Sequence, residues 1–280
     1  MMENMLKGKV AWVTGASSGM GEATALTFGR EGATVIVGGG RRKERALETC
    51  KAIEAAGGIA RYYGSLDVSD PKNIQEHYQK IIDEFGRVDI LAAFAGKSFD
   101  NDNLPKEEHW QRTMDVNMRG MYDCCMAVFP GMKAQRSGSI IICSSNGAFN
   151  PTTPAYEYHM AKGACEALSA NLALDGAAYG VRVNCIKPGC ILTGFWDELI
   201  PDKQEQLAFT AQIAKKEVPL QRAGTAQDIA NVALFFASEL SSYVTGLRLF
   251  VGGGQGYIYS AGQSFLLSDD AQDTLPVGVR

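Results

Sequence analysis

The chain has 280 residues, enough for one large domain or two small ones. Hydrophobic residues make up 46% and charged residues 21%, which excludes a disordered, collagen-like or coiled-coil chain. The formal net charge is −4, so no overall positive field would gather nucleic acid or an anionic membrane surface. A small molecule is therefore the expected partner, and neither nucleic acid nor a membrane is expected.

The cysteines and the N-terminal segment bear on location. The N-terminal segment has no apolar stretch followed by a small-residue cleavage site, and no apolar run reaches the ~18–20 residues that span a membrane. Seven cysteines occur without C-x-x-C spacing, and Cys143 and Cys185 lie in apolar runs where a thiol behaves as a small hydrophobic group. These features predict a cytoplasmic protein that is neither secreted nor membrane-spanning.

Short apolar or β-branched runs alternate with longer stretches of helical apolar spacing. The predicted strands are Val10–Thr14, Thr34–Val37, Ile59–Tyr63, Val88–Phe94, Ser139–Cys143, Val181–Ile186 and Leu247–Val251. The predicted helices are Gly19–Glu31, Arg42–Ala56, Pro71–Phe85, Lys106–Lys133, Ala155–Tyr179 and Ala226–Ser238. This alternation predicts an α/β fold of Rossmann type, a doubly wound parallel sheet of about seven strands in a single domain.

The expected domain covers residues 1–254, and residues 255–280 form a tail without a regular pattern. Within the domain, segment 189–224 has no clear strand and is longer than a routine connection. It is either a lid over a substrate site or an unrecognised helical insert, and we favour the lid.

A glycine-rich segment, residues 14–21 (Thr-Gly-Ala-Ser-Ser-Gly-Met-Gly), joins the first strand to the first helix. Glycines there allow a tight turn and let backbone N–H groups and a helix N-terminus approach a pyrophosphate. A tight strand-to-helix turn without any ligand needs the same residues, so the loop alone does not identify a nucleotide site.

Together with Asn117, Ser145 and Tyr158-x-x-x-Lys162, this loop resembles the short-chain dehydrogenases/reductases, and the resemblance extends from about Leu6 to Gly254. Other family motifs lie in the family's order: Asp67-Val68, Ser144-Ser145 and Pro188-Gly189. The resemblance implies an NAD(P)(H)-dependent oxidoreductase that interconverts a ketone and a secondary alcohol.

The candidate catalytic residues are Asn117, Ser145, Tyr158 and Lys162. Tyr158 and Lys162 are four residues apart in a predicted helix, so both project from one face. A lysine ammonium and an oxidised nicotinamide would lower the tyrosine pKa, which suits Tyr158 to general acid/base chemistry. The resemblance implies that Lys162 also binds the ribose, Ser145 the substrate oxygen, and Asn117 a water of a proton relay. The neighbours Tyr156 and Ser144 do not match the family spacing.

The resemblance also implies a set of cofactor-binding residues, in which Asp67 bonds the adenine amine, Val68 packs on the adenine, and Ile191 and Thr193 hold the nicotinamide carboxamide. The full set is Gly15, Ser17, Ser18, Gly19, Met20, Gly39, Arg41, Arg42, Asp67, Val68, Ala95, Gly96, Tyr158, Lys162, Pro188, Gly189, Ile191 and Thr193.

Charge after the second strand indicates which dinucleotide is bound. The segment Val37-Gly38-Gly39-Gly40-Arg41-Arg42-Lys43 has no acidic residue before Glu44. An acidic residue there would repel a ribose 2′-phosphate, whereas arginines attract it. NADP(H) is therefore favoured as the cofactor, with NAD(H) as the alternative.

The chain departs from the family pattern in two places. Ala93-Phe94-Ala95-Gly96 stands where the family usually has N-N-A-G, so we expect Phe94 to pack in the interior instead of forming hydrogen bonds. Val251-Gly252-Gly253 stands where the family more often has V-D-G-G.

The substrate candidates are largely apolar and aromatic, and comprise Ser145, Asn146, Phe149, Tyr158, Phe195 and Trp196. This lining favours a bulky or ring-bearing ketone, a steroid being one example, over a sugar. The three histidines are far apart in the sequence, so no catalytic metal is expected.

Two alternatives stay open for the function: a 3-oxoacyl-[acyl-carrier-protein] reductase, and a non-catalytic nucleotide-binding regulatory protein on the same fold. The resemblance implies a homotetramer, or else a homodimer.

Overall fold

The computed structural model describes residues 4–40, 42–99, 103–151, 155–194, 200 and 202–255. Within them, parallel strands form one seven-stranded sheet in the order β3-β2-β1-β4-β5-β6-β9. The strands are β1 Val10–Thr14, β2 Thr34–Gly38, β3 Ile59–Arg61, β4 Ile90–Ala93, β5 Gly138–Cys143, β6 Val181–Pro188 and β9 Arg248–Val251. The predicted Rossmann-type sheet in a single domain is confirmed.

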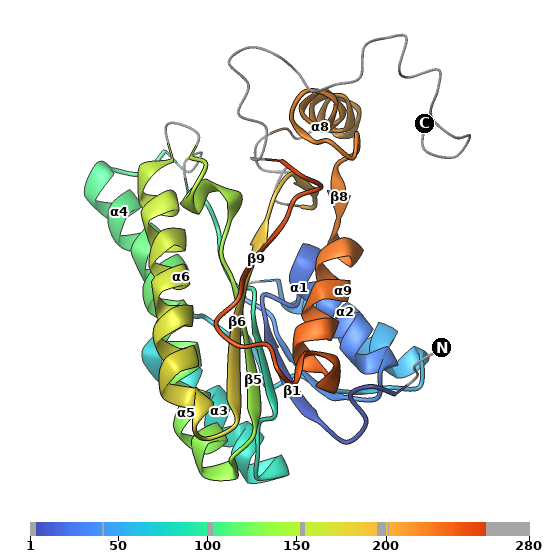
Figure 1. Ribbon diagram of the computed structural model, residues 1–280, viewed down its shortest axis with the longest axis vertical. Coiled ribbons are helices and arrows are strands. Elements are labelled where there is room, and N and C mark those ends of the chain that lie inside the picture. The colour runs from blue at the N-terminus through green and yellow to red at the C-terminus, as the bar shows by residue number, and fades with distance from the viewer. Residues whose placement is uncertain are drawn as a thin grey trace.

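Helices cover both faces of the sheet (Figure 1). One face carries α1 (Gly19–Arg30), α2 (Lys43–Ala55) and α9 (Ala226–Ala237), and the other α3 (Pro71–Phe85), α4 (Lys106–Met114), α5 (Gly120–Gln135) and α6 (Tyr156–Ala177). Successive side chains of a strand point to opposite faces, so each strand serves two cores. In β1, Ala11 and Val13 join one cluster, and Val10 and Trp12 join the other.

The predicted helix Lys106–Lys133 is not one continuous α-helix. Asp115–Arg119 form a π-helical turn, η1, between α4 and α5. Such turns release backbone groups from the regular helical ladder and occur often at functional sites. The turn contains Asn117, and helical spacing resumes on both sides of it, which is why the apolar pattern does not reveal it.

Segment 189–224 contains both a helix and a small strand pair. The elements are β7 (Ile191–Leu192), α8 (Lys203–Glu217) and β8 (Gly224–Thr225), with β7 and β8 parallel. The sequence shows no strand here because two residues display no period. Cys190 packs with Ala214 and Val218 in a small core of their own. Helix α8, which carries Ala214, lies beyond the end of β9 (Figure 1). The segment thus contains a helix. That it acts as a lid over the substrate site stays a prediction.

The strand order reverses at β1, which has β2 on one side and β4 on the other. In doubly wound sheets, ligands bind at this point, outside the carboxyl ends of the strands. The loops after β1 and β4 meet there, because the Ala95 backbone N–H donates to Thr14 Oγ1 at 3.1 Å. No helix in the described part of the chain combines the length and apolar character needed to cross a membrane.

Two glycines with positive φ, one in the loop after β1 and one in the connection between α2 and β3, allow the tightness of packing in the first loop to be tested. Gly15 has φ +69° and Gly57 has φ +84°, but a Cβ at Gly15 would lie 2.8 Å from the Ala95 nitrogen, whereas one at Gly57 would meet nothing within 4 Å. We expect Gly57→Ala to lower the free energy of unfolding by about 1–2 kcal/mol, the cost of left-handed backbone. Overpacking should make Gly15→Ala lose about 1–3 kcal/mol more. Denaturant unfolding measures both losses, and equal values would contradict the prediction.

Candidate active site

The loop after β1 is built for close backbone approach. Gly15 packs against the Ala95 backbone. Gly19 has φ +59°, and a Cβ at that position would lie 3.3 Å from Thr193 Cβ. The loop leads into the N-terminus of α1, where Ser18 makes no side-chain cap. The first backbone N–H groups of α1 are therefore available to an anion.

The end of β2 lies beside this loop. A Cβ at Gly39 would lie 2.5 Å from Ala46 Cβ and 3.3 Å from Ser17 Cβ, so only glycine fits without a shift. Ser17 itself is buried, and Met20 packs against the core from the first turn of α1. Gly39 and Ser17 therefore pack together beside the ends of β1 and β2.

Other predicted cofactor residues lie after β2 and β3. Arg42 is exposed and immediately precedes α2, while Arg41 lies outside the described residues. Val68 is buried after β3, and Asp67 Oδ1 accepts hydrogen bonds from Ser69 N at 3.0 Å and Ser69 Oγ at 2.6 Å. The Asp67 carboxylate is thus held in a fixed turn.

The segment after β6 lies at the same edge of the sheet, at the carboxyl ends of the strands. Pro188 is the last residue of β6, and the Gly189 N–H donates to Val251 O at 3.0 Å. Ile191 is buried in β7, and Thr193 approaches the glycine loop. The predicted nicotinamide end therefore faces the predicted pyrophosphate loop.

The predicted catalytic residues lie around the buried ammonium of Lys162. Lys162 is 2% exposed, and its Nζ donates to Cys143 O at 3.1 Å. The same Nζ lies 5.6 Å from the centroid of the Tyr158 ring, and a Cβ at Gly96 would lie 3.0 Å from it. The Ser145 hydroxyl lies near enough to the Tyr158 hydroxyl to favour the phenolate. Three predicted catalytic residues are thereby brought together.

The pKa values of the central pair follow from burial and mutual charge. Burial raises the pKa of Tyr158, and the Lys162 ammonium and the Ser145 hydroxyl oppose this by favouring the phenolate. Burial lowers the pKa of Lys162, but the phenolate and nearby thiolates raise it, and the net direction is upward. In the protein by itself burial is the larger effect on the Tyr158 pKa. The lowering expected when an oxidised nicotinamide is also bound stays a prediction.

Asn117 fastens the loop after β4 to the π-helical turn. Its Nδ2 donates to Lys97 O at 2.7 Å and Thr113 O at 3.0 Å, and its Oδ1 accepts from Lys97 N at 3.1 Å. The Cys165 thiol donates to Asn117 O at 3.2 Å. With Phe94 buried in the core as predicted, this two-point clamp ties the loop down where the family's asparagine pair is missing.

On the substrate side, Ser145 is followed by a 3-10 turn, η2 (Asn146–Ala148), and then by the exposed Phe149. Asn146 Oδ1 is buried without a hydrogen-bond partner. Phe195 and Trp196 lie outside the described residues.

The sequence missed three residues next to Phe149. These are Glu166, Lys187 and Phe250, which contact one another or Phe149. A lysine near the end of an otherwise apolar strand was the available signal.

These residues fit a dinucleotide. The tight glycine cradle and the uncapped α1 N-terminus suit a pyrophosphate, and Lys162 has more donors than its one bond to Cys143 employs. Among the described residues, no group of three or more His, Cys, Asp or Glu side chains is placed to hold a metal ion. The absence of a catalytic metal stays a prediction.

Comparison with known proteins agrees with this geometry. Residues 15–255 match the family model described as "Enoyl-(Acyl carrier protein) reductase". The chain is 36% identical over 250 residues to a 3-oxoacyl-[acyl-carrier-protein] reductase of Thermotoga maritima, covering 89% of this chain and 98% of that protein.

Two solved structures are also similar. L-sorbose reductase from Gluconobacter frateurii, complexed with NADPH and L-sorbose, aligns with a TM-score of 0.82 and 30% identity, covering 91% of this chain and 98% of the other. A gluconate 5-dehydrogenase from Burkholderia cenocepacia, in complex with NADP and tartrate, aligns with a TM-score of 0.79 and 28% identity, covering 90% and 96%. The chain belongs to the short-chain dehydrogenase/reductase family and is an NAD(P)-dependent oxidoreductase.

Proposed function

We propose that this protein interconverts a ketone and a secondary alcohol with NADP(H), and that Tyr158 is its general acid/base. The observation that carries the proposal is the grouping of Tyr158 with Ser145 and the buried Lys162 ammonium. A regulatory protein that only bound a nucleotide could use Lys162 for the ribose, but it would have no need for Ser145 and Tyr158 beside that ammonium. The alternative of a non-catalytic nucleotide-binding regulatory protein is therefore the weaker one.

The bound nicotinamide supplies or accepts the hydride. In reduction, Ser145 donates a hydrogen bond to the carbonyl oxygen, where negative charge develops, and the Tyr158 hydroxyl gives that oxygen a proton. In oxidation, the Tyr158 phenolate takes the proton from the alcohol. Lys162 stabilises the phenolate and offers donors to the ribose, while Asn117 holds the adjoining loop and a relay water.

We assign the cofactor end to the residues around the glycine loop. The α1 N-terminus and Gly15, Gly19 and Gly39 would hold the pyrophosphate and adenosine, with Asp67 and Val68 at the adenine. Arg42, exposed before α2, and Arg41 supply the positive charge for a 2′-phosphate. The structures of two relatives with NADPH or NADP support this preference.

The substrate we favour is a bulky apolar or ring-bearing ketone, a steroid-like one being an example, because Phe149 is an exposed aromatic beside Ser145. Similarity to the Thermotoga maritima protein supports a second candidate, 3-oxoacyl-[acyl-carrier-protein] reduction. Turnover that depends on acyl carrier protein would select the second candidate. Good activity on polyols and poor activity on all bulky ketones would exclude the first.

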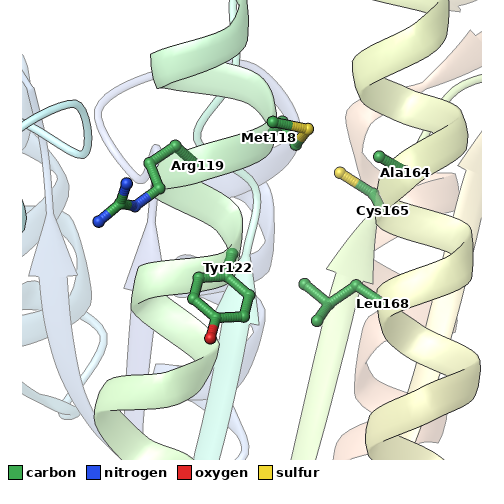
Figure 2. A pocket seen from close by; sticks show the side chains of 6 residues that line it. All are labelled: Met118, Arg119, Tyr122, Ala164, Cys165 and Leu168. Atoms are coloured by element: carbon green, nitrogen blue, oxygen red, sulfur yellow. The ribbon is translucent and has the colours of Figure 1, made fainter.

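We further propose a homotetramer, or else a homodimer. Helices α4, α5 and α6 expose the large apolar side chains Trp110, Tyr122, Met126 and Met160, of the kind that interfaces between copies bury. A cavity of about 220 Å³ lies between α5 and α6, where Tyr122 and Leu168 extend from the two helices (Figure 2). All seven cysteines are buried free thiols, which supports a cytoplasmic location.

Replacing the Tyr158 hydroxyl tests the chemical assignment. We expect Tyr158→Phe to reduce kcat for ketone reduction by about 10²–10⁴-fold, the usual contribution of a positioned acid. Stopped-flow measurement of hydride transfer from NADPH to a ketone panel gives the rate, and fluorescence titration checks that NADPH still binds. Tyr156→Phe is the matched control, because Tyr156 is 62% exposed. Equal rates for both variants would refute the role of Tyr158.

Removing the ammonium tests the electrostatic role of Lys162. Lys162 lowers the pKa of Tyr158, so Lys162→Met should raise that pKa further. Oxidation needs the phenolate, and the rising limb of kcat/KM against pH should therefore move to higher pH, whereas Lys162→Arg should keep it lower. The profile is measured with an alcohol substrate at saturating cofactor. A limb that does not move, or moves to lower pH, would contradict the assignment.

Cofactor preference is tested at the start of α2. Arg42→Ala, and likewise Arg41→Ala, should weaken NADPH binding about tenfold through loss of a charge-assisted hydrogen bond. NADH binding should stay the same, since NADH lacks the phosphate. Arg45→Ala is the control, because Arg45 pairs with Glu48 at 3.4 Å. Fluorescence titration measures NADPH and NADH binding to the three variants and to the unmodified protein. An equal loss of affinity for both cofactors would show that these arginines do not recognise the phosphate.

A further inference from the structure

The glycine that replaces the family's aspartate near the end of β9 makes room for an aromatic ring. A Cβ at Gly252 would overlap the ring of Phe250. The ring also lies close to the segment after β6, since a Cβ at Gly189 would be 3.4 Å from Phe250 Cζ. Any side chain at position 252 would therefore push the Phe250 ring away from its place.

The Phe250 ring meets Phe149 from the Ser145 loop. The two ring centroids are 5.4 Å apart with an interplanar angle of 79°, the edge-to-face arrangement that aromatic pairs prefer. Phe149 follows the η2 turn that begins after Ser145, and it remains 45% exposed. The pair thus spans from the Ser145 loop to Gly189, and the Phe149 ring stays partly exposed.

The Lys187 side chain contacts the Phe149 ring. Lys187 on β6 is the register partner of Phe250 on β9, so the two side chains share a sheet face. Lys187 Nζ lies 4.0 Å from the centroid of the Phe149 ring, within the range of a cation–π contact.

The ammonium is itself fixed in place. It lies 3.2 Å from Glu166 Oε1 and the same distance from Oε2, and the two side chains are only 12% and 13% exposed. The single hydroxyl hydrogen of Ser144 is shared between two acceptors, Lys162 O at 2.9 Å and Glu166 Oε1 at 3.2 Å from Oγ. The clamp on Phe149 is therefore continuous with the helix that carries Tyr158 and Lys162.

We propose that Phe149 and Phe250, together the aromatic clasp, form the surface on which a ring of the substrate packs, and that Lys187 is the positioning residue that holds Phe149. The inference rests on the proposed function and narrows its substrate class to ketones that carry a planar apolar ring a few bonds from the carbonyl. A ketone without such a group loses the contact, because a small polar chain cannot pack against two aromatic faces.

Two ketones that differ only in a phenyl group test the clasp. With saturating NADPH, kcat and KM are measured for 4-phenyl-2-butanone and 2-butanone, and the ratio of the two kcat/KM values is compared between variants. Phe149→Leu and Phe250→Leu should lower this ratio about tenfold, through KM and not kcat. Gly252→Ala should lower it in the same direction by displacing the Phe250 ring.

Lys187 is tested by removing its charge and then restoring it. Lys187→Met should lower the ratio about threefold, the value of a cation–π contact, and Lys187→Arg should restore it. Lys133→Met is the matched control: Lys133 pairs with Asp175 at 2.8 Å and lies 4.4 Å from the Tyr179 ring, at the other end of α6. That control should leave the ratio as it is in the unmodified protein.

The outcomes separate the two levels of the proposal. Unchanged ratios in both phenylalanine variants, or a fall in kcat for both ketones alike, would overturn the clasp while ketone reduction stands. An unrestored ratio in Lys187→Arg would overturn the positioning role. If the unmodified protein reduces no ketone although NADPH binds, the proposed function fails and the clasp with it. Thermal unfolding and NADPH titration of every variant show that each one is folded.

Discussion

The arrangement of the site depends on the burial of one ammonium group. An isolated buried charge costs several kcal/mol, so Lys162 needs acceptors around its Nζ. The Cys143 carbonyl at 3.1 Å supplies one of them, and a negative charge on Tyr158 favours the ammonium more than any other nearby group does. The need to bring β5, the start of α6 and Gly96 around this nitrogen explains why a glycine follows Ala95: a side chain there would occupy the space of the ammonium.

Asn117 solves a second problem, that of holding an irregular loop beside this charge. The loop after β4 has no sheet partner beyond Ala93, so its backbone groups need others. Asn117 supplies both a donor and an acceptor to Lys97, and it reaches them because the π-helical turn carries it out of the regular α-helical path. The departure from N-N-A-G is therefore tolerated: Phe94 adds core packing, and the loop is held from the helix side.

Much of this could be predicted from sequence, and the failures share one cause. The bounds of Val10–Thr14 and Pro71–Phe85 match because strong periodicity ends at clear signals, such as Asp70 capping α3 and left-handed Gly86 closing it. The four-residue spacing of Tyr158 and Lys162 likewise predicted that both lie on one face of a helix. The π-helical turn and the two-residue β7 depend on packing across the fold, and no local pattern records packing.

The same reasoning separates the chemistry of the site from its selectivity. Tyr158 and Lys162 lie on one helix and are tied together by its geometry, so their spacing alone carries the reaction class. The side chains at Phe149, Lys187 and Phe250 come from three different elements, and each has meaning only in the presence of the others. Substituting Gly252 would disturb Phe250 without touching any catalytic group. Substrate selectivity on this scaffold can therefore change through positions that leave the proton-transfer residues in place.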